Sequence, residues 1–286
     1  MIITNELNLP ESFVNMAKQD YIFADNEYRV TSLLKGIRET ILERRHFDEI
    51  EQDVSDMIWL LFGTAVHGIL EHQTEGDNEL KEERIKVTIG DYLLSGQFDL
   101  YNDETKTITD YKTCSVWKVI FGDYSDWRKQ TLIYAYMIRR FGFWADNAEI
   151  IAIMKDHSKR DAKIKPDYPQ FPVKKISFKF TEQDFTEIEE WLKSRFAEIA
   201  EAEKLPDDEL PLCTPEERFN SGDKFAVMKN GRKTAMRVLD SMEEAELWMA
   251  DNGGDSIEIR KGEDKKCKEY CSACEFCNYY REQVKE

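Results

Sequence analysis

The sequence predicts an α/β protein in which helices flank a mixed central sheet, followed by a small ββαβ module and a cysteine-rich tail. Three observations support this. Apolar residues recur at helical spacing before and after a polar hairpin, two β-rich runs follow, and four cysteines lie between residues 267 and 277. A chain of 286 residues with 41% hydrophobic content suits one large domain with an appended module.

Three helices are predicted before the hairpin. The first spans 10–18. The second spans about 31–46, where Thr31 or Ser32 can serve as the N-cap and the apolar residues form one stripe. The third, about 55–72, is apolar on most sides, so we expect it to be deeply packed.

The third helix carries a histidine whose role has two interpretations. Gly63, His67 and Glu71 are spaced four residues apart and share one face. A lone histidine there is more often a core residue satisfied by Glu71. The position immediately before a carboxylate-bearing hairpin favours His67 as a metal ligand, with Glu71 as a group that supports it.

The hairpin has the sequence GQFDLYNDETKTITDYKT over residues 96–113. Residues 87–100 and 107–113 are rich in β-branched and aromatic side chains, and the turn residues 102–104 separate them. Side chains alternate along a strand, so Asp110 and Lys112 share one face. We therefore expect two paired strands with charged groups on one side.

The two aspartates of this hairpin are predicted to face each other. With the turn centred between Glu104 and Thr105, Asp99 lies opposite Asp110, with Cβ atoms about 5 Å apart. Like charges so placed are destabilising unless a cation lies between them. A divalent metal fits, with Lys112 close enough to orient or activate a water molecule. The alternative is a surface hairpin whose charges pair in solvent.

The segment after the hairpin completes the α/β pattern. A helix is predicted from Ser125, its N-cap, to Gly142, followed by strands at 148–154 and 174–180 and an amphipathic helix at 181–204. The order helix, hairpin, helix, strand, strand, helix indicates a mixed sheet.

The charge distribution limits the interactions of the chain. A net charge of -17 disfavours non-specific coating of nucleic acid. Two islands oppose it: residues 155–179 have eight Lys or Arg against three Asp, and residues 224–237 have five against none, so each is +5. They are either phosphate-contacting surfaces or solvated faces. No signal peptide or membrane span is expected, which favours the cytoplasm.

A separate module is predicted before the last cysteines. Asn230-Gly231 is a strong hairpin signal that joins FAVMK to RKTAMRVL. Ser241 and Glu244 form a capping-box pattern for a helix, and the strand SIEIR follows. We divide the chain into residues 1–212, 213–266 and 267–286.

The cysteines predict a metal centre in the tail. The sequence CKEYCSACEFC contains Cys267, Cys271, Cys274 and Cys277. An all-sulfur site suits a [4Fe-4S] cluster or Zn²⁺. Its ligands are either these four or Cys213 with three of them. Cys114 is expected to be a core residue. Stabilising the fold of the tail is a simpler role for the metal centre than redox sensing.

The motifs GTAVH, GQFDL, ITDYKT and QTLIY, in this order, resemble those of RecB-like nucleases in the PD-(D/E)XK superfamily. The resemblance covers roughly residues 31–134. Each motif alone is weak, whereas the ordered set is specific. It implies a restriction-endonuclease-like core of a mixed sheet flanked by helices.

The resemblance also implies roles for individual residues. His67, Asp99 and Asp110, with the carbonyl near Tyr111, are implied metal ligands, and Asp110 stands where many relatives have Glu. Lys112 is implied to assist the attacking water. The pair Gln130 and Tyr134 is implied in substrate contact.

The tail resembles the iron–sulfur staple of the AddB nuclease domain and of CRISPR-associated RecB-like nucleases. Cys271 and Cys277 keep the five-residue gap of that staple. The gap from Cys267 to Cys271 is one residue longer, Cys274 is additional, and Cys213 follows the nuclease motifs instead of preceding them. Both the cluster type and the ligand set therefore stay open.

The resemblance as a whole implies a Mg²⁺- or Mn²⁺-dependent deoxyribonuclease. It is most similar to stand-alone exonucleases of phages and prophages, which act in the bacterial cytoplasm on DNA ends, often beside a single-strand annealing protein. No G-x-x-x-x-G-K loop for an ATP-driven motor is present. The alternatives are an endonuclease or nickase, a non-catalytic DNA- or partner-binding protein, and an iron–sulfur redox sensor.

Overall fold

A computed structural model describes residues 1–18, 23–72 and 76–285, and it divides the chain into two compact units. Unit 1 comprises Met1–Lys35 and Phe47–Lys204, and unit 2 comprises Gly36–His46 and Leu205–Glu286. None of the helices in the described part of the chain is both long and apolar enough to cross a membrane. The three-part division of the sequence stays a prediction.

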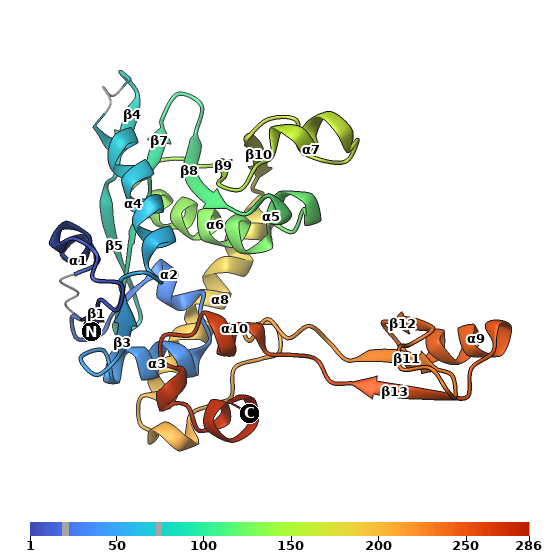
Figure 1. Ribbon diagram of the computed structural model, residues 1–286. Helices are drawn as coiled ribbons and strands as arrows, with labels where there is room; N and C mark the ends of the chain where they lie inside the picture. Colours follow the sequence, from blue (N-terminus) through green and yellow to red (C-terminus); the bar gives the residue numbers. More distant parts are fainter. Residues whose placement is uncertain (19–22, 73–75, 286) are drawn as a thin grey trace. The chain divides into compact units, whose positions relative to one another are not determined.

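Unit 1 mixes helices and strands (Figure 1). Its helices are α1 (Glu11–Ala17), α2 (Val30–Leu33), α4 (Ile58–Glu71), α5 (Val116–Phe121), α6 (Ser125–Arg139), α7 (Lys159–Ile164) and α8 (Glu182–Ala202). Its strands are β1 (Ile2–Thr4), β2 (Glu27–Arg29), β3 (Glu51–Asp53), β4 (Glu79–Lys81), β5 (Arg84–Ile89), β6 (Tyr92–Gln97), β7 (Leu100–Asn102), β8 (Thr107–Cys114), β9 (Asn147–Met154) and β10 (Val173–Lys179).

The main sheet of unit 1 has the strand order β10-β9-β8-β7-β4. β8 and β9 are parallel, and the other neighbours are antiparallel. Parallel neighbours need a long crossover, which α5 and α6 supply. Both α4 and α6 contact β8. This mixed sheet with flanking helices confirms the predicted fold class. Two smaller sheets have the orders β2-β6-β5 and β1-β3.

The two helices that contact β8 contact different side chains of that strand. On α4, the His67 ring lies 6.2 Å from the Tyr111 ring. On α6, Gln130 accepts a hydrogen bond from Lys112 at 2.9 Å. Since Tyr111 and Lys112 point to opposite faces of β8, the strand presents one face to each helix.

One predicted strand is two strands in the structure. Residues 87–100 contain the end of β5, all of β6 and the first residue of β7, because Gly90 adopts a φ of +60° and turns the chain. Ile89 then pairs with Tyr92 across the turn. β6 and β7 belong to different sheets, so the chain changes sheets just before Leu100.

The predicted helix at 31–46 is also divided. α2 ends at Leu33, and α3 begins at Ile37 in unit 2. Gly36 stands at the N-cap of α3 in an extended conformation, ψ 147°. A Cβ on Gly36 would lie only 2.5 Å from the Cys213 Sγ, so the close approach of this cysteine requires glycine.

The expectation that the third helix is deeply packed is wrong. α4 begins at Ile58, and Leu61 is buried, but Trp59, Leu60 and Phe62 are exposed. Neighbouring elements cover one face of the helix, although its composition is apolar on most sides.

The later elements of unit 1 follow the predictions closely. α6 begins at Ser125 itself and ends at Arg139, and Gly142 follows with a φ of +87°. α8 begins with a complete capping box between Thr181 and Asp184. β9 and β10 lie within one residue of the predicted bounds.

Unit 2 contains the predicted ββαβ module and the cysteine tail. Its elements are α3 (Ile37–Arg45), η1 (Asp207–Glu209), β11 (Lys224–Met228), β12 (Arg237–Leu239), α9 (Met242–Asn252), β13 (Ser256–Arg260), α10 (Lys265–Glu269), η2 (Cys274–Phe276) and η3 (Tyr280–Val284). The sheet order is β12-β11-β13. Gly231 makes the predicted tight turn, since Arg232 N donates to Lys229 O, but β12 begins only at Arg237.

Candidate functional site

The aspartates of the β7–β8 hairpin occupy the register that the turn predicts. Leu100 pairs with Thr109, so Asp99 and Asp110 come next along the two strands. The Asp99 Oδ2 accepts a hydrogen bond of 2.6 Å from the amide of Tyr111. The hairpin therefore fixes the Asp99 carboxylate against β8.

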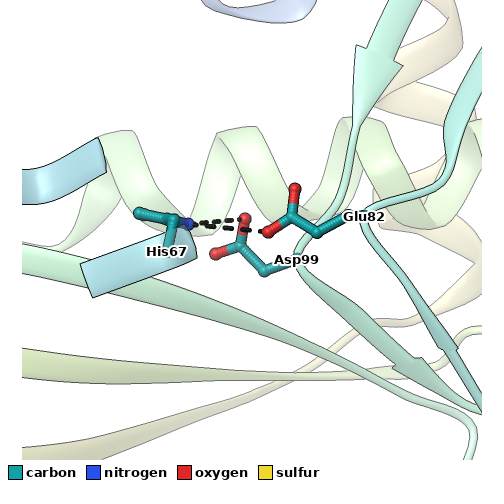
Figure 2. A group of neighbouring side chains, drawn as sticks. All are labelled: His67, Glu82 and Asp99. Atoms are coloured by element: carbon teal, nitrogen blue, oxygen red, sulfur yellow. Dashed lines mark ion pairs between the residues drawn. The ribbon is translucent and has the colours of Figure 1, made fainter. Parts of the chain in front are cut away.

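A histidine and two carboxylates converge at the start of this hairpin (Figure 2). The His67 Nδ1 lies 3.2 Å from the Asp99 Oδ1 and 3.8 Å from the Glu82 Oε1. One donor atom from each residue lies within 4.8 Å of the other two. The hydrogen bond to Asp99 raises the pKa of His67, although burial opposes this. One imidazole and two carboxylates are a donor set that suits a divalent ion such as Mn²⁺ or Mg²⁺.

Glu82 is the site residue that the sequence did not reveal. Its backbone is left-handed, with a φ of +47°, in the connection between β4 and β5. Glu82 N donates to Asp99 O at 3.1 Å, and Gln97 Nε2 donates to Glu82 Oε2 at 2.7 Å. A left-handed non-glycine residue costs about 1–3 kcal/mol and is typical of functional sites. In the sequence, this segment reads as an ordinary charged turn.

Asp110 is buried beside this group and pairs with the lysine of the same strand. The Lys112 Nζ lies 2.9 Å from the Asp110 Oδ2. Burial raises the pKa of Asp110, and the charge of Asp99 adds to this, while Lys112 opposes it. Apart from the ion pair, this Oδ2 makes no hydrogen bond with any described residue. A buried carboxylate oxygen with so few partners fits the ligand set of a cation.

A chain of hydrogen bonds links the lysine to α6. The Lys112 Nζ donates to Gln130 Oε1 at 2.9 Å, and the Gln130 Nε2 donates to the Tyr134 hydroxyl at 3.1 Å. Tyr134 is only 4% exposed, and burial raises its pKa, so the phenol stays neutral. Tyr134 therefore contacts Gln130, and the predicted contact of this pair with a substrate stays a prediction.

A family model of the PD-(D/E)XK nuclease superfamily matches residues 10–215. The chain belongs to this superfamily. No match was found among the curated proteins. Assignment to the RecB-like branch stays a prediction.

Three solved structures are similar to this superfamily member. SSO0001 has a TM-score of 0.46 and 16% identity, covering 65% of this chain and 82% of that one. A phage-related exonuclease from Haemophilus somnus 129PT has a TM-score of 0.34 and 13% identity, covering 61% and 95%. LHK-Exo in complex with dAMP has a TM-score of 0.34 and 12% identity, covering 60% and 91%.

In this PD-(D/E)XK protein, the candidate site residues predicted from the sequence lie at different distances from one another. His67 and Asp99 meet directly, together with Glu82. Asp110 lies outside that closest group but within electrostatic reach of His67. The side chain of Glu71 lies outside the described residues, so its supporting role stays a prediction.

Gly96 is required by the packing of Tyr134. A Cβ at this position would lie 2.8 Å from the Tyr134 Cε1 and 3.0 Å from the Val30 Cγ2. We predict that Gly96→Ala lowers the free energy of unfolding by about 1–3 kcal/mol, because the Tyr134 ring must move. Cleavage should slow as well, since Gln130 loses its partner. Denaturant unfolding and initial rates check this.

The control for that prediction is Gly68→Ala. This glycine lies in α4, and a Cβ there would meet nothing within 4 Å. Alanine should leave the free energy of unfolding equal or higher, because it is the better helix former. An unchanged stability in Gly96→Ala would contradict the packing that positions Tyr134.

Five cysteines of unit 2 line one pocket with the N-terminal part of α3. They are Cys213, Cys267, Cys271, Cys274 and Cys277. Burial raises the pKa of the Cys267 thiol to about 11. Arg38 Nη1 lies 3.7 Å from the Cys277 Sγ, and the half-buried Lys266 forms a 2.6 Å ion pair with the buried Glu39. α3 thus supplies charged groups next to the sulfurs.

A tetrahedral zinc site with Zn–S of about 2.3 Å requires sulfurs roughly 3.8 Å apart. No three cysteine sulfurs within residues 1–18, 23–72 and 76–285 lie within 4.8 Å of one another. Cys114 is buried in the core of unit 1, as predicted.

Proposed function

We propose that this chain is a divalent-metal-dependent deoxyribonuclease that hydrolyses phosphodiester bonds, and that it acts as an exonuclease on DNA ends. Membership of the PD-(D/E)XK superfamily supports nuclease activity. The observation that supports metal dependence is the convergence of His67, Asp99 and Glu82 beside the buried Asp110–Lys112 pair.

Four side chains and one carbonyl are the proposed ligands. His67, Asp99, Glu82 and Asp110 would hold Mg²⁺ or Mn²⁺, with the carbonyl of Tyr111 as a further donor. Such an ion polarises the scissile phosphate and lowers the pKa of an attacking water. The low exposure of Asp99 and Asp110 keeps competing solvent away from these carboxylates.

Lys112 is the proposed positioning group for the nucleophile. Its ammonium has three N–H donors, and contacts with Asp110 and Gln130 account for two. The third can hold an attacking water or a phosphate oxygen. Because Tyr134 fixes Gln130, it acts on the reaction through the orientation of Lys112.

End-labelled linear, nicked and circular DNA, incubated with and without Mg²⁺ or Mn²⁺, tests the proposal. The proposed exonuclease releases nucleotides from linear and nicked DNA only, and only with metal. Glu82→Gln should reduce the rate, whereas the exposed neighbour variant Glu83→Gln should not. Cleavage of closed circles would indicate the endonuclease alternative. Metal-independent binding without any cleavage would indicate a non-catalytic protein.

The pH dependence of cleavage should depend on the metal concentration. The raised pKa of His67 means that its ring keeps a proton to higher pH than usual, and a protonated ring cannot ligate. Activity should therefore fall as the pH is lowered through that pKa, and more Mn²⁺ should move this fall to lower pH. Rates measured against pH at two Mn²⁺ concentrations check this. If the cleavage rate falls at the same pH at both Mn²⁺ concentrations, His67 is excluded as a ligand.

The cysteine pocket is the proposed site of a [4Fe-4S] cluster, with Zn²⁺ as the alternative. Cys213, Cys267, Cys271 and Cys277 are the proposed ligands, with Cys274 as an alternative one. The chemistry of the donors supports this, because five thiols line one pocket. Iron and zinc content and the visible absorption of anaerobically purified protein separate the two. A partnership with a single-strand annealing protein in a bacterial cytoplasm is part of the same proposal.

A further inference from the structure

Two helices of unit 1 expose pairs of large aromatic rings. On α4, Trp59 is 56% exposed, and its ring meets the Phe62 ring edge-to-face at 6.4 Å. On α5, Trp117 is 56% exposed and Phe121 is 77% exposed, and their rings stack at 5.8 Å. Exposed apolar groups gathered in this way mark a binding surface.

These rings are exposed although both helices are well anchored. α5 packs into the core through Val116 and Val119, which leaves Trp117 and Phe121 one turn apart on its outer side. α4 is held by the buried Leu61. The outward rings therefore lie on helices that also carry buried side chains.

A lysine beside the end of β8 contacts the ring pair of α4. The Lys155 Nζ lies 4.2 Å from the centre of the Trp59 ring. Lys155 N donates to Cys114 O at 3.0 Å, at the C-terminal end of β8. The adjacent Asp156 accepts hydrogen bonds from Ser115 Oγ and Val116 N at the start of α5.

We define the ring surface as the surface formed by Trp59, Phe62, Trp117, Phe121 and Lys155. It begins beside Cys114, two residues beyond Lys112 on β8. Figure 1 shows α5 following the end of β8, and α4 contacts the same strand. Measured along β8, the ring surface therefore begins about 7 Å beyond Lys112.

We propose that the ring surface binds unpaired bases of single-stranded DNA, so that the catalytic site acts on a single strand. This rests on the proposed nuclease function. Every base offers a π-face, and stacking on exposed aromatic side chains is a sequence-tolerant way to bind a single strand. Bases in a duplex are already stacked on one another and cannot use these rings.

The local charge favours this occupant over a second protein copy. The chain has a net charge of -17, yet residues 155–179, which begin with Lys155, are +5. The ammonium of Lys155 beside the Trp59 ring complements a strand that presents both phosphates and bases. An apolar patch for a protein partner needs no such cations.

The test measures binding without cleavage. In EDTA, fluorescence anisotropy of a labelled dT oligonucleotide of about 20 nucleotides gives Kd, and quenching of tryptophan fluorescence reports stacking. Trp59→Ala and Trp117→Ala should each raise Kd about 10-fold or more and reduce the quenching. Trp59→Phe should restore most of the affinity. A blunt duplex of equal length should bind equally weakly to all variants.

Trp144→Ala is the matched control. Trp144 is 58% exposed but precedes the start of β9, whereas Lys155 follows its end. The strand spans about 26 Å, so this tryptophan lies far from the ring surface. Its replacement should leave the Kd for the oligonucleotide unchanged.

The outcomes separate this inference from the proposed nuclease function. Unchanged Kd and quenching in both tryptophan variants would overturn the inference even if the protein cleaves DNA. Loss of self-association in Trp59→Ala with unchanged DNA binding would assign the surface to a second copy and also overturn it. Weaker oligonucleotide binding by the two tryptophan variants in EDTA would support the inference even if the protein cleaves no DNA.

Discussion

Replacing Asp110 with alanine is expected to reduce DNA cleavage about 10³-fold and leave the protein folded. The loss follows because Asp110 is a proposed metal ligand and holds Lys112 at 2.9 Å. Initial rates with saturating Mg²⁺ measure it. Asp103→Asn is the control, because Asp103 is a carboxylate at the opposite end of the same hairpin, where it pairs with Lys106.

Asp110→Ala is also expected to change the thermal stability of the protein. Burial raises the pKa of Asp110, so near neutral pH its charge destabilises the folded state relative to the unfolded chain. Without metal, Asp110→Ala should therefore melt at the same or a higher temperature near pH 7. The gain should shrink in acid, where the carboxyl is protonated in both states. Wild-type cleavage rates in Asp110→Ala would contradict its role.

Replacing Cys271 with serine is expected to empty the proposed metal centre and to destabilise unit 2 by several kcal/mol. Cys271 belongs to both proposed ligand sets, and burial raises the pKa of its thiol, so a bound cation would favour the thiolate. Metal content and limited proteolysis of unit 2 measure the two effects. Full metal content in Cys271→Ser would exclude this centre.

Two further variants separate the ligand sets. Cys213→Ser should lose the metal if the distant cysteine is a ligand, and Cys274→Ser should lose it if the four tail cysteines are the set. Cys114→Ala is the control, since this buried thiol belongs to the core of unit 1. Its metal content should match the wild type.

The sequence was informative where local rules decide the structure. The turn at 103–106 determines the register, so the placement of Asp99 opposite Asp110 could be predicted from spacing alone. The alternation along β8 put Asp110 and Lys112 on one face, and the structure pairs them. The helix predicted at 181–204 agrees with α8, whose N-cap is Thr181.

The features that were missed depend on tertiary contacts. Glu82 reaches the site because its left-handed backbone bonds to Asp99, which no local pattern signals. The composition of α4 predicted burial, but which faces are covered depends on the neighbouring elements, and Trp59 stays exposed. Likewise, the cysteine spacing predicted a metal centre but gave no sign that Arg38 of α3 would line its pocket.

The most direct test is a crystal structure of the protein soaked with Mn²⁺, with anomalous scattering recorded at the manganese edge. We predict an anomalous peak at coordination distance from the Asp99 carboxylate and a ring nitrogen of His67, adjacent to Glu82, and its loss in Asp99→Asn. A manganese peak that contacts neither Asp99 nor His67, in crystals that cleave DNA, would contradict it.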